Sequence, residues 1–273
     1  MRISILLLLA AIGAGFAQPD KATQYFEQAQ GTPDLNAKIA LLKQSLASGN
    51  SYKSQYALGE AYRKLSRYDE AETAFLDAMQ LTKDEKELAR SAFRLGQTAE
   101  GRGRIPDAIA WVTVSRKHYA YPESGEALKK LELGRLDKPQ PAAEIVAALS
   151  SVSRSSKMIA SVNVRIHFAL NSADLSPDGR RQARELGNAL SAPAFASRRF
   201  LLAGHTDQQG EDGFNLDLSK RRAKTVEQFL ERETGIAKGR LKVEGRGKKE
   251  PLFTGKMDED HRLNRRVEII LLP

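Results

Sequence analysis

An acid and an arginine at close spacing are the residues of this sequence best suited to chemistry. Asp207 ends the run Gly204-His205-Thr206-Asp207, and Arg222 lies in the segment expected to form the next helix. A carboxylate accepts hydrogen bonds from an ammonium group, and a guanidinium fork grips a carboxylate. Fixed side by side, the two match a zwitterion that carries an amino group and a carboxylate on one carbon. Such a pair suits binding and does not by itself break bonds.

Arg222 interrupts an apolar helical stripe. At about 100° per residue, Leu218, Val226 and Phe229 fall on the same helix face as Arg222. Leaving a buried charge without a partner costs about 3–5 kcal/mol, so an arginine in this stripe needs an acid beside it. We therefore expect the Asp207 carboxylate to pair with the Arg222 guanidinium.

Arg265 interrupts a second apolar pattern, which has the period of a strand. It shares parity with Val267 and Ile269, whereas Arg266 shares parity with Glu268. We therefore expect Arg265 to start the inward-facing row of the last strand, beside the acid and the arginine described above. The alternative to a ligand site is a structural ion-pair network among these three charged side chains.

The first part of the chain, residues 21–136, is expected to be helical throughout. One segment has the spacing of a tetratricopeptide repeat, a helix pair of about 34 residues, and the spacing recurs from Leu95-Gly96 onward. The first copy is marked by Leu58, Gly59, Tyr62, Ala71, Phe75 and Ala78. This resemblance to the tetratricopeptide family implies a helical solenoid with a concave surface for a protein or peptide partner. The alternative is a spacer without a partner of its own.

The second part of the chain changes period. Residues 137–160 are expected to be a linker, because Pro139 and Pro141 break the helical pattern and residues 150–156 are rich in serine, although 142–149 could form a short helix. From 161 to 273 strands alternate with helices; we expect strands at 162–168, 200–203, 241–244 and 267–272, and helices from 177 and over 216–232. The fold class is therefore α + α/β: a helical-hairpin solenoid followed by an α/β sandwich with a mixed sheet and helices on one face.

The composition and the first residues bound the compartment. Residues 1–17 have the basic start, short apolar core and small-residue end of a signal peptide, and the apolar run is shorter than the ~20 residues that span a bilayer. Without cysteine the chain has no disulfide, thiolate nucleophile or lipidation site. We expect an exported protein with no transmembrane segment in its mature form. The net charge of +9 suits an anionic wall or membrane surface, or only solvates the protein, and the aromatic residues lack the interleaving that nucleic-acid binding requires.

Residues 162–272 resemble the OmpA-like peptidoglycan-binding domain, which outer-membrane protein A shares with Pal lipoproteins and flagellar stator proteins. The residues that carry the resemblance are Phe168, Leu175, Gly204, His205, Thr206, Asp207, Gly210, Asn215, Leu218, Ser219, Arg222, Ala223, Val226, Leu230, Gly245, Gly247, Pro251, Asn264, Arg265, Arg266, Val267 and Glu268. Residues 260–263 and the basic stretch 247–250 depart from the family pattern, and both border the expected site.

The resemblance implies that the domain binds the diaminopimelate of peptidoglycan stem peptides. The site residues that it implies are Asp207, Arg222, Asn215, Thr206, Arg265 and Asn171. It also implies a periplasmic protein at the cell wall of a Gram-negative bacterium, with the outer membrane as a further candidate for attachment. The helical repeats would then bind an envelope partner protein.

Two alternatives to a wall-binding protein stay open. His205 near Asp207 and Ser219 suggests a cell-wall hydrolase, because a nucleophile needs a base within hydrogen-bond reach. However, Ser219 falls in an expected first helical turn, where hydroxyls cap backbone amides, and the sequence lacks a nucleophile elbow and helical metal-ligand spacing. We therefore expect no catalysis, no metal and no cofactor. The second alternative is an interaction scaffold whose C-terminal domain is only structural.

Overall fold

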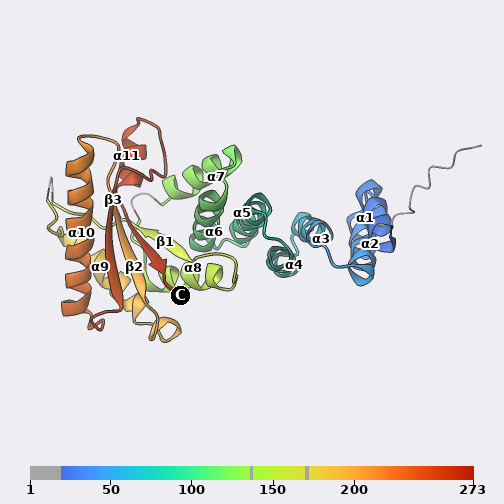
Figure 1. Cartoon of the computed structure of the whole chain (residues 1–273), viewed down its shortest axis with the longest axis horizontal. Helices are drawn as coiled ribbons and strands as arrows, with labels where there is room; N and C mark the ends of the chain where they lie inside the picture. The colour runs from blue at the N-terminus through green and yellow to red at the C-terminus, as the bar shows by residue number, and fades with distance from the viewer. Residues whose placement is uncertain (1–19, 136–137, 170–171) are drawn as a thin grey trace, which may run out of the picture.

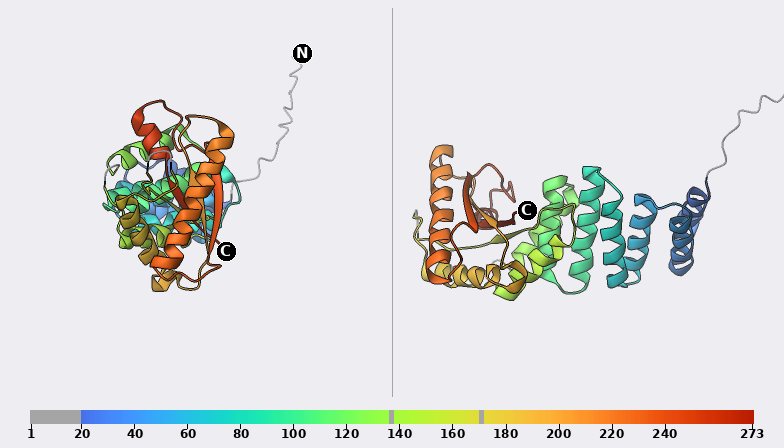
Figure 2. Two further views of the ribbon diagram at one scale, coloured as in Figure 1. Left: turned by 90° about the vertical axis from the view of Figure 1, so that its left-hand side faces the viewer. Right: turned by 60° about the horizontal axis from the view of Figure 1, so that its bottom comes forward.

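The computed structural model describes residues 20–135, 138–169 and 172–273 and shows an elongated molecule, with helix hairpins leading to an α/β domain (Figure 1). The expected signal peptide at 1–17 lies outside the described residues. The hairpins are α1 (Lys21–Gly31) with α2 (Leu35–Ser48), α3 (Tyr52–Lys64) with α4 (Tyr68–Gln80), and α5 (Glu85–Gly101) with α6 (Ile105–His118). Figure 2 shows these pairs stacked along the long axis. Within the described residues no helix combines the length and apolarity needed to cross a membrane.

Small residues let the paired helices approach closely, as the repeat spacing predicts. A Cβ atom at Gly59 would lie 2.7 Å from the Phe75 ring, and one at Gly96 would lie 2.6 Å from Val112. Several helices also begin at a capping side chain: the Asp34 carboxylate, for example, accepts from the backbone amide of Ala37 at 2.7 Å. The predicted helical solenoid is therefore confirmed.

One more helix completes the helical array, and a second helix connects this array to the C-terminal domain. They are α7 (Pro122–Leu133) and α8 (Ala142–Ser153). The expectation of a linker over the serine-rich stretch is wrong up to Ser153, because apolar side chains of α8 recur at helical spacing and are buried, among them Leu149 and Val152. The hydroxyl of Ser151 accepts a hydrogen bond from the Trp111 indole at 2.8 Å, which ties α8 to α6.

The C-terminal domain contains a four-stranded mixed sheet, as predicted. Its elements are β1 (Ser161–Val164), α9 (Pro177–Leu190), β2 (Phe200–His205), α10 (Asp212–Glu233), β3 (Leu241–Gly247), α11 (Asp258–Asn264) and β4 (Val267–Leu271), with a 3₁₀ turn at Pro193–Phe195. The strand order is β1-β4-β2-β3, in which β2 and β3 are parallel and the other pairs antiparallel. The short helix α11 was not expected from the sequence.

The two faces of the sheet are covered by different parts of the chain. The face that carries Leu202 and Ile269 packs against α10, and α9 joins the same core (Figure 1). The opposite face carries Ser161 and Glu268, and Lys117 of α6 contacts both side chains. The prediction of helices on one face is therefore incomplete, since helix α6 of the array lies at the second face, where Lys117 pairs with the buried Glu268.

Candidate ligand-binding site

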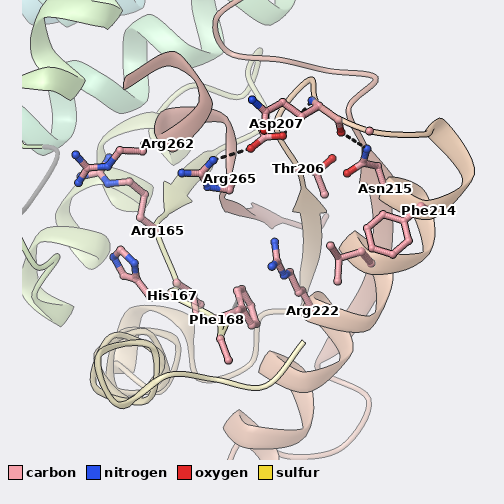
Figure 3. Close-up of a pocket in the computed structure, with 15 residues that line it drawn as sticks. Arg165, His167, Phe168, Thr206, Asp207, Phe214, Asn215, Arg222, Arg262 and Arg265 are labelled. Carbon is pink, nitrogen blue, oxygen red and sulfur yellow. Dashed lines mark hydrogen bonds and ion pairs between the residues drawn. The ribbon is translucent and has the colours of Figure 1, made fainter. Parts of the chain in front are cut away.

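A cavity of about 670 Å³ opens at the end of β2 (Figure 3). Its walls are the segment 165–169, the loop 206–210, the first turns of α10, and side chains from the end of α11. The predicted site residues that the structure describes all line this cavity, namely Asp207, Arg222, Asn215, Thr206 and Arg265. Asn171, the remaining predicted site residue, lies outside the described residues.

Backbone contacts hold the loop that carries the acid. A Cβ atom at Gly204 would lie 2.1 Å from the carbonyl oxygen of Ser219, so glycine there lets α10 lie directly on β2. The Ser219 hydroxyl donates to the Leu216 carbonyl at 2.8 Å and accepts from the Gly247 amide at 2.9 Å. Thr206 then donates its backbone amide to the carbonyl of Gly247 at 3.0 Å. The Ser219 hydroxyl therefore ties α10 to the end of β3, and this structural contact explains why a serine stands here without a catalytic role.

Asp207 pairs with Arg265, and the expected pairing with Arg222 is wrong. The Asp207 carboxylate accepts from Arg265 Nη1 at 2.6 Å and from the backbone amide of Gln209 at 3.1 Å. Arg265 is the C-cap residue that directly follows α11, and β4 begins only at Val267. The expected inward-facing strand position of Arg265 is therefore also wrong, although its side chain still reaches the cavity, because the turn after α11 directs it there.

Arg222 extends from α10 into the cavity from the side opposite Asp207 (Figure 3). Its Nε donates to the backbone carbonyl of Ser172 at 3.0 Å, and its guanidinium lies 4.9 Å from the centre of the Phe168 ring. Burial lowers the pKa of Arg222, and the nearby Arg265 lowers it further, against the opposing effect of Asp207. The surroundings thus disfavour the charge of Arg222, and an anionic ligand in the cavity would favour it.

Asn215 and Thr206 shape the rim of the cavity. The Asn215 amide nitrogen donates to the carbonyls of Gln209 at 2.6 Å and Glu211 at 3.1 Å, which closes the loop before α10. Gly210 adopts a positive φ of 79° within that loop, a conformation that favours glycine. Among the described residues the buried Thr206 hydroxyl has no hydrogen-bond partner. It therefore remains a polar group that a ligand or water would satisfy.

Sequence reasoning missed several residues of the cavity wall. The missed residues include Arg165, His167, Phe214 and Arg262. Arg262 lies on α11, within the stretch 260–263 that departs from the family pattern, so that departure was the available signal. Arg165 follows a buried strand and points toward the helical array, an arrangement that strand parity alone does not indicate.

A cluster on the far side of β2 could be mistaken for a metal or catalytic site. Ligand atoms of His205, Glu250 and Glu268 lie within 4.8 Å of one another. However, Arg246 Nη1 lies 2.8 Å from the Glu250 carboxylate and 3.3 Å from that of Glu268, so a guanidinium already supplies the positive charge between the carboxylates. His205 is 2% exposed and faces Glu268 rather than the cavity. The His205, Asp207 and Ser219 side chains therefore do not assemble into a hydrolase site.

Comparison with known proteins finds a family match within each of the two parts of the chain. Residues 167–265 match the model of the OmpA family, and residues 51–119 match a tetratricopeptide-repeat model. The chain is 33% identical over 103 residues to the peptidoglycan-associated lipoprotein of Pseudomonas aeruginosa, covering 38% of this chain and 59% of the relative. It is 36% identical over 107 residues to the outer-membrane lipoprotein YfiB of the same organism, covering 39% and 62%. Outer membrane protein A of Bordetella avium is 35% identical over 107 residues, covering 39% and 54%. The chain therefore spans 54% to 62% of the length of these relatives.

Two solved structures match parts of this chain. The peptidoglycan-associated lipoprotein from Burkholderia pseudomallei matches at 22% identity with a TM-score of 0.35, covering 39% of this chain and 88% of that one. The cell wall anchor of the T6SS from Pseudomonas aeruginosa matches at 26% identity with a TM-score of 0.37, covering 49% and 98%. On the family matches, the chain carries an OmpA-family domain at residues 167–265, preceded by a tetratricopeptide-repeat region at residues 51–119.

Proposed function

We propose that this protein binds peptidoglycan non-covalently and has no catalytic activity. The ligand group is the diaminopimelate of the stem peptide, and the site is the cavity that contains Asp207 and Arg222. The observation that carries the proposal is that these two side chains approach one cavity from opposite sides, with Arg222 held by backbone and ring contacts (Figure 3). The names of the relatives, two of which are lipoproteins and one of which is called peptidoglycan-associated, support the same ligand.

The charges of the cavity suit an amino acid head group. The ligand's ammonium group would bind the Asp207 carboxylate, and its carboxylate would bind the Arg222 guanidinium, whose charge the surroundings disfavour when the cavity has no anion. Arg265 would remain the counter-ion of Asp207 on the open side, where its side chain is 42% exposed. The lining has more arginines than acids, which favours a ligand with several carboxylates over one with a single carboxylate.

The protein would reside at the cell wall in the periplasm of a Gram-negative bacterium. The net charge of +9 favours an anionic polymer. A polymer offers many copies of one stem peptide, so modest affinity at each site suffices when several molecules bind along the same strand.

The helical repeats would bind a partner protein of the envelope. Helices α3 and α5 present a group of aromatic and charged side chains that are partly exposed: the rings of Tyr52 and Tyr56 lie 5.6 Å apart, and the Tyr56 hydroxyl accepts from Arg94 Nε at 3.0 Å. Rigid aromatic and arginine side chains are typical of protein-binding surfaces. If the C-terminal domain were only structural, this surface would be the working part of the molecule.

Co-sedimentation with purified diaminopimelate-type sacculi tests the wall-binding proposal. The protein, expressed from Gln18, is compared with Asp207→Ala and with Asp217→Ala as a matched control, since Asp217 is an exposed acid on α10 that pairs with Arg221. We expect the parent and the control to sediment with sacculi, and Asp207→Ala to stay in solution while circular dichroism shows it folded. If the parent itself stays in solution, the proposal is wrong and the repeat scaffold becomes the leading function.

A further inference from the structure

Helix α7 of the helical array contacts the C-terminal domain through two ion pairs with buried acids. The Glu132 carboxylate, 3% exposed, accepts from Arg165 Nη1 at 2.6 Å. Lys129 Nζ lies 2.6 Å from the Asp260 carboxylate, which is 1% exposed. Residues three apart lie on the same face of a helix, so one face of α7 makes both pairs. Both partners belong to segments that form walls of the ligand cavity.

The pair with Arg165 fixes the first wall. Arg165 also donates its Nη2 to the backbone carbonyl of Arg135 at 2.6 Å, and its side chain is only 10% exposed. The chain runs on from Arg165 to Phe168, whose ring lies beneath the Arg222 guanidinium. A shift of Arg165 would therefore move the surface on which Arg222 rests. In Figure 3 the green helices of the array lie beside Arg165 at the edge of the cavity.

The pair with Asp260 fixes the second wall. The Asp260 carboxylate accepts from the backbone amide of Met257 at 3.3 Å and so holds the first turn of α11, while Lys129 compensates its buried charge. Helix α11 carries Arg262 into the cavity wall and is directly followed by Arg265, the residue that pairs with Asp207. Loss of the Lys129 ammonium would leave a buried carboxylate unpaired at the start of this helix.

We propose that Glu132 and Lys129 are positioning residues of the ligand cavity, through which the helical array sets two of its walls: the segment with Phe168, on which Arg222 rests, and helix α11, which Arg265 follows. The family match begins at residue 167, so α7 and Arg165 lie outside it. This inference rests on the proposed function, because the affinity it concerns is that for the stem peptide. A partner that moves α7 when it binds the array would change the affinity of the protein for the cell wall. By thermodynamic reciprocity, binding to the cell wall would change the affinity of the protein for that partner by the same factor.

The affinity of full-length protein for a soluble disaccharide-tetrapeptide that contains diaminopimelate tests the proposal. We expect Glu132→Gln and Lys129→Met each to raise the Kd about three- to tenfold, a range typical of residues that act on a site without touching the ligand. Two control variants should keep the parent's Kd. Glu100→Gln removes an exposed partner of α7, the one that pairs with Lys130 at 3.1 Å. Lys117→Met breaks the pair with Glu268, which joins the same two parts of the chain on the far face of the sheet.

A double-mutant cycle separates positioning from general destabilisation. If Glu132 acts through Arg165, Glu132→Gln should have no further effect on the Kd in an Arg165→Met background. Glu132→Asp, which keeps the charge, serves if Glu132→Gln fails to fold, and it should give an intermediate Kd. All titrations are run well below the unfolding temperature of each variant.

The outcomes distinguish this inference from the function on which it rests. If Asp207→Ala abolishes binding but Glu132→Gln and Lys129→Met keep the parent's Kd, α7 only stabilises the fold and the positioning role is wrong. If the two effects on the Kd add fully in the cycle with Arg165→Met, the proposed route through Arg165 is wrong. If the parent does not bind the muropeptide, both proposals fail together.

Discussion

Two groups of charged side chains lie on opposite sides of β2, and they differ in how completely they are paired. In the cavity group Asp207 pairs with Arg265, whereas Arg222 donates to a backbone carbonyl and lies over the Phe168 ring. Arg265 is 42% exposed, so this group is open to solvent. The polar groups of the cavity thus have bonding capacity that a ligand can use.

The charges of the group on the other side of β2 are more fully compensated, although this group also borders a cavity, of about 900 Å³. Burial alone would raise the pKa of Glu268, but His205, Lys117 and Arg266 outweigh burial and hold it well below its usual range. Arg266 donates its Nε to the Asn163 side chain at 2.9 Å and its Nη2 to the backbone carbonyl of Glu250 at 3.1 Å. Burial lowers the pKa of Arg266 to about 10, which means that burial disfavours its charge. The nearby Glu268 and the hydrogen bonds of Arg266 oppose this effect.

The difference shows how to tell a binding site from a structural network when both contain acids and arginines. A network whose members compensate one another stabilises the fold, because removal of one member leaves another buried and unpaired. A group with an under-compensated guanidinium at an open cavity contributes more to the affinity for a ligand than to the stability of the fold. Loss of a member should therefore affect stability on one side of β2 and affinity on the other.

Glu268→Gln should produce the largest effect and confine it to stability. The substitution leaves Arg246 and Arg266 without their buried acid, so we expect the free energy of unfolding to fall by about 3 kcal/mol, with the muropeptide Kd unchanged. Urea unfolding and calorimetric titration measure the two quantities. Glu244→Gln is the matched control, because Glu244 pairs with the same Arg246 at 3.0 Å but is half exposed. An equal loss of stability in the control would contradict the contrast between the two groups.

Arg222→Lys should produce the opposite result. A lysine cannot reproduce the guanidinium fork, so we expect the Kd for the muropeptide to rise about tenfold, while the unfolding midpoint stays close to the parent's. The neighbouring Arg221→Lys is the control, since Arg221 lies on the same helix and pairs with the exposed Asp217. A large drop in the midpoint of Arg222→Lys would place Arg222 in a structural network after all.

Much of this arrangement follows from local sequence patterns. The glycines that allow close helix packing are visible as repeat spacing, and Arg222 stands out because it interrupts an apolar stripe. Periodicity tells which face of a helix or strand a side chain occupies, and it singled out Arg222, whereas Asp207 was predicted as the acid in the loop beside that helix face. It does not tell which partner the side chain meets. The pairing of Asp207 with Arg265 depends on the turn after α11, a helix too short to leave a periodic signal.

For a related reason, the sequence does not predict the ion pairs between the helical array and the C-terminal domain. The parity of Glu268 indicates the second face of the sheet, but a charged face is normally exposed to solvent. Its partner Lys117 lies on α6, far away in the sequence, and nothing in the spacing of either segment connects them. The same holds for Glu132 with Arg165 and Lys129 with Asp260. Such pairs become visible only when the array is placed against the sheet.

Acid should weaken the group on the far side of β2 through His205. Burial lowers the pKa of His205, with help from Arg266 and Arg246 and against the effect of Glu268. Because the folded-state pKa is below the unfolded value of about 6.5, the unfolded state binds more protons, and stability falls as the pH drops below about 6.5. Urea midpoints measured between pH 7 and pH 5 test this. The decline should be smaller than the loss in Glu268→Gln and should disappear in His205→Gln, whereas His118→Gln should retain it.

Added salt should change the muropeptide Kd but not the stability loss in Glu268→Gln, and this is the smallest effect that we expect. Raising the NaCl concentration from about 0.1 M to about 1 M shortens the Debye length from about 10 Å to about 3 Å, and this screening acts mainly on exposed charges. The exposed Arg265 and the ligand's charges will be screened, so we expect the muropeptide Kd to rise about two- to fivefold, the range typical of exposed ion pairs. Glu268 is 1% exposed, and its ion pairs should hardly respond, so the Glu268→Gln loss of stability should be the same at both concentrations. If salt instead removed that loss and left the Kd unchanged, the assignment of one group to binding and the other to stability would have to be reversed.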